Sequence, residues 1–272
     1  MTDRTGPRTI DSQKVTFPGH KGDSLAARLD LPSGTIGAYA LFAHCFTCSK
    51  DIAAARGISH ELAAAGIAVL RFDFTGLGAS GGEFANTDFS SNVEDLVQAS
   101  AFLRENYAAP ALLVGHSLGG AAVLAAASRI AEVRAVVTIG APADVEHVLH
   151  QLGSSLEEIE ARGEAEVRLG GRPFRIARSF VDDARMQDLT TTVAGIKAAL
   201  LVLHAPTDQM VGIDNAARIF TAARHPKSFV SLDGADHLLT AQADAAYAAR
   251  VIAAWGSRYL PMGAGAGAGR PG

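Results

Sequence analysis

The chain has 272 residues, of which 48% are hydrophobic, enough to bury the core of one large domain or two small ones. Its 24 Lys and Arg residues against 28 Asp and Glu residues give a formal net charge of -4, without the basic excess that nucleic-acid binding requires. The apolar runs are far shorter than the roughly 20 residues of a membrane-spanning helix, and residues 1–14 lack the apolar stretch of a secretory signal. We therefore expect a cytoplasmic protein with neither nucleic acid nor a membrane as a partner.

Apolar segments rich in β-formers alternate along the chain with Ala-rich segments of helical period. The strands predicted in this way cover residues 39–45, 67–74, 111–117, 134–140, 198–205 and 227–234. The predicted helices cover residues 51–66, 88–107, 118–131, 213–224 and 238–260. Because the strands are apolar without alternation, they indicate an α/β fold, with a mostly parallel sheet covered by helices on both faces. Segments 14–19 and 24–32 predict an antiparallel hairpin at the edge of the sheet.

Residues 141–195 interrupt this alternation and are predicted to form a lid. They contain an acidic helix candidate at 155–167, with a solvated face around Glu157, Glu158 and Glu160, and a small hairpin that turns at Gly170 and Gly171. Six hydrophobic side chains in this insertion favour packing over a cleft: Val148, Leu149, Leu152, Phe174, Ile176 and Phe180.

The domain organisation predicted from these patterns is simple. We expect one domain over residues 1–262, with its lid at about 141–195. The Gly- and Ala-rich tail, residues 263–272, is expected to be disordered or to be the stub of a linker, because small residues cannot offset the entropy of ordering.

The segment 115-GHSLGG-120 carries the strongest chemical signal in the sequence. It is a Gly-x-Ser-x-Gly pattern at the point where a predicted strand ends and a predicted helix begins. A nucleophilic serine on such a sharp turn needs small neighbours two residues away on either side, and Gly115 and Gly119 provide them. The N-terminus of the following helix offers free N–H groups to an oxyanion that forms beside Ser117. We therefore predict that Ser117 is the catalytic nucleophile.

A serine hydroxyl is a weak nucleophile at neutral pH, so Ser117 needs a histidine base that a carboxylate orients. His237 follows the last predicted strand and stands at the same carboxyl edge of the sheet as Ser117. Asp208 follows the strand predicted at 198–205 and lies at that edge too. These residues predict a triad with the chain order Ser, Asp, His, which is the order of the α/β-hydrolases.

Other histidines and aspartates are weaker candidates for these roles. His116 is expected to point away from the serine, His60 lies within a predicted helix, and three more lie on lid or surface segments: His147, His150 and His225. Asp236 directly precedes the predicted base and would struggle to reach its own neighbour's ring. Asp73 is better explained as a structural residue of a loop.

Five segments together resemble the serine α/β-hydrolase family over roughly residues 14–260: 41-LFAHCFTCSKD-51, 72-FDFTGLGASGGEF-84, 115-GHSLGG-120, 207-TD-208 and 236-DH-237. Within them, 44-HCFTCS-49 resembles the His-Gly-Phe-Thr-Gly-Ser loop of lidded feruloyl or cinnamoyl esterases, with Cys45 and Cys48 in place of glycines. The resemblance implies that the backbone N–H groups of Phe46 and Leu118 form the oxyanion hole. The chain is also similar to hydrolase domains fused to an OsmC-like domain, which implies that the tail marks where such a domain starts or was removed.

The two cysteines leave two interpretations open. A side chain at Cys45 would narrow the acyl pocket or strain the backbone beside the oxyanion hole. The favoured interpretation is that Cys45 and Cys48 are small buried residues packed under the lid. The alternative is a thiol-redox pair, since Cys-x-x-Cys spacing at a helix N-terminus lowers the pKa of a thiol.

The sequence predicts neither a metal site nor a nucleotide site. No second Cys or His pair of zinc-binding spacing follows the cysteines, and Glu146 with two nearby histidines is too sparse. Four glycines form neither a P-loop nor a Rossmann fingerprint and instead predict a tight turn: Gly76, Gly78, Gly81 and Gly82.

These observations predict a cofactor-free serine hydrolase that resembles a carboxylesterase. We expect it to hydrolyse small to medium acyl or aryl esters through an acyl-enzyme at Ser117, so its partner is a small-molecule ester. A homodimer and a fused OsmC-like domain are both compatible with the sequence. The alternatives are an amide or peptide hydrolase with the same triad, and a thiol-redox or partner-binding protein that uses Cys45 and Cys48.

Overall fold

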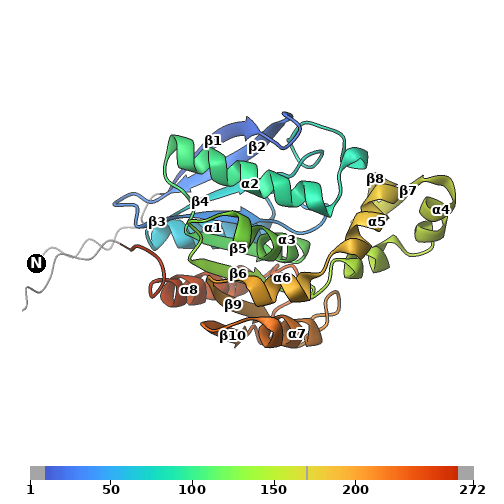
Figure 1. Ribbon diagram of the computed structural model, residues 1–272. Helices are drawn as coiled ribbons and strands as arrows, with labels where there is room; N and C mark the ends of the chain where they lie inside the picture. The colour runs from blue at the N-terminus through green and yellow to red at the C-terminus, as the bar shows by residue number, and fades with distance from the viewer. Residues whose placement is uncertain (1–9, 170, 263–272) are drawn as a thin grey trace, which may run out of the picture.

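The computed structural model describes residues 10–169 and 171–262, and its centre is an eight-stranded sheet of order β1-β2-β4-β3-β5-β6-β9-β10 (Figure 1). The strands are β1 (Asp11–Pro18), β2 (Ser24–Leu31), β3 (Ala38–Ala43), β4 (Ile67–Phe72), β5 (Leu112–His116), β6 (Ala135–Ile139), β9 (Ala199–His204) and β10 (Lys227–Ser231). Strands β1 and β2 form the predicted antiparallel hairpin, β2 is antiparallel to β4, and the other neighbours are parallel. The predicted α/β class and mostly parallel sheet are confirmed.

Helices cover both faces of the sheet, because the central strands are apolar on both sides. Helices α1 and α8 pack together on one face, whereas α2, α3, α6 and α7 cover the other. Their bounds are α1 (Ala53–Ala64), α2 (Phe89–Asn106), α3 (Leu118–Ala126), α6 (Leu189–Gly195), α7 (Asp214–Ala222) and α8 (Gln242–Gly256). Each face buries its own apolar core, so the sheet is held rigidly between two layers.

The last helix begins later than predicted. The sequence pattern places a helix over 238–260, but α8 starts at Gln242, and the preceding residues form a turn. Leu239 has a φ of 49°, and the Asp236 carboxylate accepts a hydrogen bond from the backbone N–H of Thr240 at 3.0 Å. His237 therefore lies in a loop between β10 and α8, where its side chain can turn toward the sheet edge.

The insertion, residues 141–195, comprises a 3-10 segment (Glu146–Leu152), α4 (Ser155–Arg162), the two-stranded hairpin of β7 (Glu164–Leu169) and β8 (Arg172–Ala177), α5 (Arg178–Met186) and α6. The part from α4 to α5 forms an end of the molecule beyond the sheet, whereas α6 returns to the sheet and packs beside α3 and α7 (Figure 1). The predicted hairpin is confirmed over its strands, although Gly170 lies outside the described residues. The helix predicted over 155–167 is wrong after Arg162, because Gly163 leaves the helix with a φ of 89° and alternating burial then makes β7 a strand.

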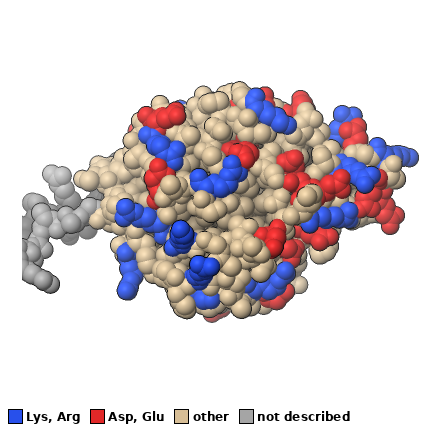
Figure 2. All heavy atoms as spheres, in the orientation of Figure 1, with Lys and Arg blue, Asp and Glu red and all other residues tan. Residues whose placement is uncertain are grey.

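Of the six hydrophobic side chains predicted to pack in the insertion, five are buried and Phe174 is partly buried. Charged side chains of both signs crowd the outer surface at this end (Figure 2). Glu157 and Glu158 are exposed as predicted, whereas Glu160 is half-buried and pairs with Arg185 at 2.7 Å. The insertion is therefore amphipathic, with an apolar inner side.

Two further sequence predictions concern the C-terminal tail and the lack of a membrane-spanning helix. The tail at 263–272 lies outside the described residues. Within the described part of the chain, no helix combines the length and the apolar character needed to cross a membrane.

Candidate active site

Three polar side chains predicted to act together follow three parallel strands at the carboxyl edge of the sheet. Ser117 follows β5, Asp208 follows β9 and His237 follows β10. His237 Nδ1 lies 2.7 Å from Asp208 Oδ2, and His237 Nε2 lies 3.0 Å from Ser117 Oγ. All three residues are buried. The structure thus joins the predicted serine, histidine and aspartate into one hydrogen-bonded series.

The turn that carries Ser117 is strained and tightly packed. Ser117 has a φ of 54°, in the left-handed region, and its N–H donates to Ile139 O at 2.9 Å. A Cβ atom on Gly115 would lie 2.3 Å from Gly119 O, and one on Gly119 would lie 2.4 Å from Ala43 O. Only glycine fits at both positions, so strand β5 and helix α3 can approach closely and the serine projects from the tip of the turn.

The carboxylate of Asp208 is positioned by its own loop. Its Oδ1 accepts hydrogen bonds from the N–H groups of Met210 at 2.8 Å and Val211 at 2.9 Å, which leaves Oδ2 for His237. Burial raises the pKa of Asp208, but the hydrogen bonds from His237, Val211 and Met210 outweigh it and hold the pKa below its ordinary value. The ionised carboxylate accepts a hydrogen bond from the Nδ1–H group of His237, which leaves the lone pair of Nε2 facing the Ser117 hydroxyl.

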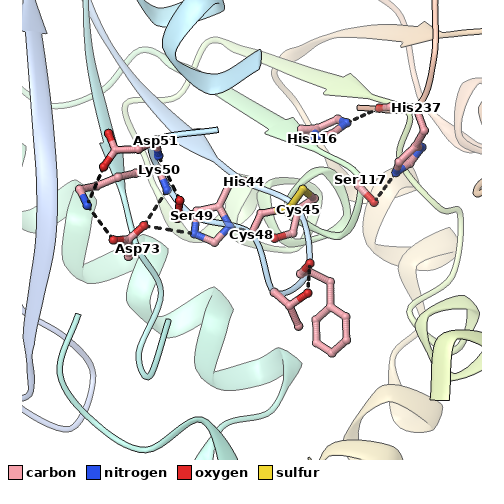
Figure 3. Close-up of a disulfide and its surroundings, with 12 residues drawn as sticks. His44, Cys45, Cys48, Ser49, Lys50, Asp51, Asp73, His116, Ser117 and His237 are labelled. Carbon is pink, nitrogen blue, oxygen red and sulfur yellow. Dashed lines mark hydrogen bonds and ion pairs between the residues drawn. A yellow bond between two sulfur atoms is a disulfide. The ribbon is translucent and has the colours of Figure 1, made fainter. Parts of the chain in front are cut away.

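His116 plays a part that the sequence did not reveal. Its ring lies 5.2 Å from the His237 ring, and its Nε2 donates to His237 O at 2.6 Å (Figure 3). Burial first, and then the nearby His237, lower the pKa of His116 to about 4. His116 is therefore neutral near pH 7 and holds the backbone that carries the predicted base.

The other weaker candidates do not join this series. His60 is exposed on α1, His150 and His225 are also exposed, and Asp236 bonds to Thr240 instead. His147 Nε2 donates to Met210 O at 2.9 Å, which ties the insertion to the loop of the acid. Among residues 10–169 and 171–262, no group of three or more His, Cys, Asp or Glu side chains is arranged to hold a metal ion.

The loop after β3, residues 44–49, is closed by a disulfide between Cys45 and Cys48 (Figure 3). The interpretation of Cys45 and Cys48 as small buried residues that only pack under the lid is therefore incomplete, because the two are bonded to each other. The loop is a tight turn, with Cys48 N–H donating to Cys45 O at 3.1 Å and a positive φ of 58° at Thr47, so the two side chains meet on one side of it. Cys45 is buried and Cys48 is half-buried. Neither residue lies at a helix N-terminus, because α1 begins at Ala53.

This oxyanion loop, as residues 44–49 are called from here on, presents an unpaired backbone donor. The N–H of Phe46 makes no hydrogen bond among the described residues. Leu118 is the first residue of α3, so its N–H has no partner within the helix. Leu118 directly follows Ser117, and Phe46 and Leu118 line the same pocket. The arrangement provides the two donors that an oxyanion would need.

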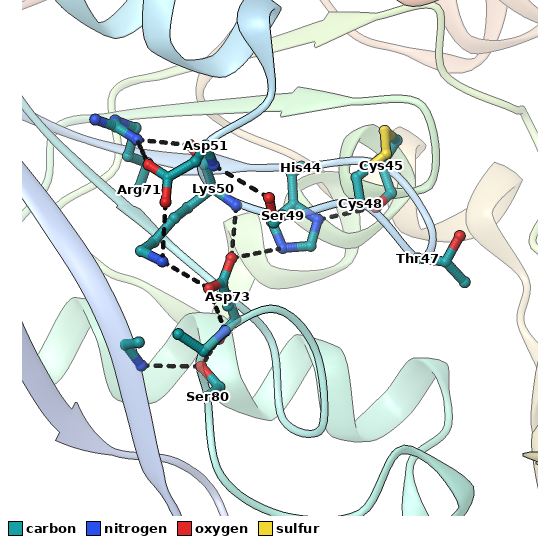
Figure 4. Close-up of polar contacts among 12 residues, drawn as sticks. His44, Cys45, Thr47, Cys48, Ser49, Lys50, Asp51, Arg71, Asp73 and Ser80 are labelled. Carbon is teal, nitrogen blue, oxygen red and sulfur yellow. Dashed lines mark hydrogen bonds and ion pairs between the residues drawn. A yellow bond between two sulfur atoms is a disulfide. The ribbon is translucent and has the colours of Figure 1, made fainter. Parts of the chain in front are cut away.

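A buried cluster of charged side chains anchors the chain directly after the oxyanion loop (Figure 4). Asp73 accepts from Lys50 N at 2.6 Å, Lys50 Nζ at 2.7 Å and Ala79 N at 2.9 Å. Arg71 bonds to Asp30 and to Asp51, each at 2.7 Å, and to Lys50 O. Asp73 is thus a structural residue, as predicted. The cluster fixes the end of the oxyanion loop against strands β2 and β4.

The insertion contacts the other side of the oxyanion loop. The Arg172 guanidinium on β8 donates to Thr47 O. The Phe46 ring stacks on Phe180 of α5, with centroids 5.4 Å apart, and Phe84 meets Phe174 of β8 edge to face at 5.1 Å. The loop is therefore held between the sheet edge and the insertion.

A narrow pocket lies beside the nucleophile. Its lining includes Phe46 and Leu118, the rings of Phe74 and Phe84, and Asn92 of α2. It encloses about 270 Å³ not filled by atoms, its open mouth included. Because the lining is mostly apolar, the pocket suits a small apolar group.

A mostly parallel sheet with a serine on a strained strand-to-helix turn is the architecture of an α/β-hydrolase. A family model described as serine aminopeptidase, S33, matches residues 51–162. The crystal structure of the esterase domain from a Rhodothermus marinus protein is 54% identical, covers 92% of this chain and 99% of that chain, and has a TM-score of 0.76. The chain belongs to the serine α/β-hydrolase family and is esterase-like.

Two more distant similarities extend this comparison. Est1E from Butyrivibrio proteoclasticus, solved with ferulic acid bound, is 18% identical over 90% of this chain and 99% of that chain, with a TM-score of 0.78, and so shares the fold. The mitochondrial palmitoyl-protein thioesterase ABHD10 of Mus musculus is 29% identical over 187 residues, or 66% of this chain. The matched region spans 62% of that relative's length.

Proposed function

We propose that the protein is a serine carboxylic ester hydrolase that acts on small to medium acyl or aryl esters. The observation that carries this proposal is the buried hydrogen-bonded series from Asp208 through His237 to Ser117, beside a narrow apolar pocket. The Rhodothermus marinus relative is described as an esterase domain, which supports the same class. We also propose that the described residues form a single catalytic domain, with the insertion as its lid.

The geometry suits a two-step reaction. Ser117 Oγ attacks the ester carbonyl while His237 Nε2 takes the hydroxyl proton, and the N–H groups of Phe46 and Leu118 stabilise the oxyanion. The protonated His237 then gives its proton to the departing alcohol, which leaves an acyl-enzyme. Water, deprotonated by His237, attacks the acyl-enzyme and releases the acid. Asp208 stays ionised throughout and stabilises the charged imidazole, which accords with its lowered pKa.

Two other substrates use the same residues. The matching family model is described as an aminopeptidase, which favours an amide bond, and the mouse relative is a palmitoyl-protein thioesterase, which favours a thioester. The narrow pocket beside Ser117 favours a short acyl group over a palmitoyl group. We therefore keep short esters as the first substrate class.

The decisive experiment measures hydrolysis of p-nitrophenyl esters across acyl lengths for the wild type and for Ser117→Ala. We expect the wild type to prefer short acyl groups and Ser117→Ala to lose on the order of 10⁴ or more in kcat, because the nucleophile is gone. Ser33→Ala, an exposed serine in the loop between β2 and β3, is the matched control and should keep full activity. More than a tenth of wild-type activity in Ser117→Ala would reject the proposal.

A further inference from the structure

A buried histidine beside the predicted acid has no role in the proposed reaction. His204 is the last residue of β9, four residues before Asp208, and its side chain is fully buried. Its Nε2 lies 2.8 Å from Val211 O, and a carbonyl oxygen can only accept, so Nε2 carries the proton and donates. The same Nε2 lies 3.7 Å from Oδ2 of Asp208, the oxygen that bonds to His237. The N–H group of His204 is therefore directed at the loop that carries the acid.

The loop around Asp208 is closed by short hydrogen bonds. The backbone N–H of Asp208 donates to Ala205 O at 3.2 Å, and Oδ1 of Asp208 accepts from the N–H groups of Met210 and Val211. The bond from His204 to Val211 O joins the far end of this loop to strand β9. Because Val211 is held at both its N–H and its C=O, the direction of its N–H group toward Asp208 is fixed.

Packing alone does not explain a histidine at this position. Nδ1 of His204 is buried and has no hydrogen-bond partner among the described residues. A buried acceptor without a partner destabilises a fold, and an apolar ring of similar size would avoid that loss. The preceding residues of the strand, Val202 and Leu203, are apolar and buried. What the histidine adds here is the N–H group of Nε2, through its bond to Val211 and its approach to the Asp208 carboxylate.

We propose that His204 is a positioning residue for the acid. Its Nε2–H group fixes Val211, the N–H group of Val211 fixes Oδ1 of Asp208, and Oδ2 stays aligned with Nδ1 of His237. The position itself is anchored, because His204 O accepts from the N–H group of Leu232 at 2.9 Å, where the chain leaves β10 toward His237. The inference rests on the proposed function, since the alignment of Asp208 matters for catalysis only if His237 is the base.

Steady-state kinetics with a short p-nitrophenyl ester test the inference. His204→Phe keeps an aromatic ring but removes the N–H donor, and we expect kcat to fall about tenfold with KM unchanged, because misaligned catalytic groups lose rate steeply. His204→Gln places an amide N–H near the position of Nε2 and should recover most of the loss. A purely structural role would lower stability in urea and leave kcat of the folded protein unchanged.

A double-mutant cycle tests whether His204 acts through the acid. In an Asp208→Asn background, His204→Phe should lower kcat by no more than about twofold, because the carboxylate that it positions is already gone. Thr138→Val is the matched control. The Thr138 hydroxyl, on the neighbouring strand β6, is also buried without a partner in the described part of the chain, and its removal should leave kcat unchanged.

The possible failures are distinguishable. Wild-type kcat in folded His204→Phe overturns the inference, as does a folded His204→Gln that recovers nothing, or a loss that persists in full in the Asp208→Asn background. If no His204 variant folds, nitrogen NMR of the wild type decides, because a His204 ring without a proton on Nε2 overturns the inference and a hydrogen-bonded Nε2–H supports it. Activity retained in Ser117→Ala would instead reject the proposed function itself.

Discussion

The two halves of the candidate active site are held in place in different ways. The acid–base half, Ser117, Asp208 and His237, sits directly after parallel strands and is fixed by hydrogen bonds to nearby backbone. The oxyanion loop, residues 44–49, depends instead on a disulfide, on a buried charge cluster and on side chains of the insertion. In the proposed mechanism, proton transfer therefore relies on the sheet, whereas the oxyanion donor proposed at Phe46 relies on contacts from distant parts of the chain.

The largest effects should come from the acid–base half. We expect His237→Ala to lower kcat by a factor of about 10⁶ and Asp208→Asn by a factor of about 10⁴. The imidazole of His237 transfers the proton, whereas the carboxylate of Asp208 only orients that imidazole and stabilises its charged form. Steady-state kinetics with a p-nitrophenyl ester measure both. If Asp208→Asn has no effect, a different carboxylate must orient His237. His225→Ala, an exposed histidine, is the control and should be silent.

A smaller effect should appear in the pH dependence of stability. Because burial and His237 lower the pKa of His116 to about 4 from its ordinary 6.5, the unfolded chain binds a proton in this range that the native state does not. The stabilisation is complete above pH 6.5 and is lost as the pH falls toward 4. Each pKa unit corresponds to 1.36 kcal/mol, so the free energy of unfolding should fall by about 3 kcal/mol over this window.

Urea unfolding of the wild type and His116→Gln between pH 7 and pH 4 measures this contribution. The free energy of unfolding of the variant should fall less steeply with decreasing pH, and the difference in slope should correspond to at most one bound proton. Asp208 does not interfere, since its pKa is held below its ordinary value by its hydrogen bonds and its own contribution is lost only at lower pH. Equal slopes in both proteins would show that His116 is not the group that titrates.

The smallest effect should come from the disulfide of the oxyanion loop. Loss of an oxyanion donor lowers kcat by about 10²–10³, but the turn keeps its Cys48–Cys45 backbone hydrogen bond and its contact with Arg172. We therefore expect Cys45→Ala with Cys48→Ala to lower kcat by about tenfold, with little change in KM.

Dithiothreitol provides the matched control. It should lower kcat of the wild type to the level of the double variant and leave the double variant unchanged. If neither the double substitution nor dithiothreitol changes the activity, the loop keeps its shape without the disulfide. A reversible loss of more than a hundredfold would instead favour the thiol-redox alternative.

The fold and the acid–base half could be predicted from the sequence because both depend on local patterns. Apolar strands without alternation indicated the parallel sheet, and polar residues directly after strands share one edge of it. The positions of Ser117, Asp208 and His237 follow from that rule. The structure brings the three side chains into hydrogen-bonding contact, and the kinetics proposed above test their catalytic roles.

The details that the sequence did not predict depend on contacts between distant segments. The hydrogen bond from His116 to His237 O could not be predicted, because the sequence carries no information on how the loop after β10 returns with His237. The disulfide was missed because its formation depends on the turn geometry at Thr47, not on spacing alone. The helix predicted over 155–167 ends at Arg162 because Gly163 leaves the helix. The acidic residues on both sides of Gly163 had favoured one continuous helix.

The crowding around Gly115 and Gly119 has a consequence for how this enzyme could acquire new substrates. Even a methyl group at either glycine would overlap backbone atoms, so almost every substitution there removes the chemistry along with the turn. Phe84, Asn92 and Phe174 lie on separate segments that can vary without moving the nucleophile. A mutational library confined to these three positions should therefore redirect substrate choice, while one confined to the serine turn should return mainly inactive proteins.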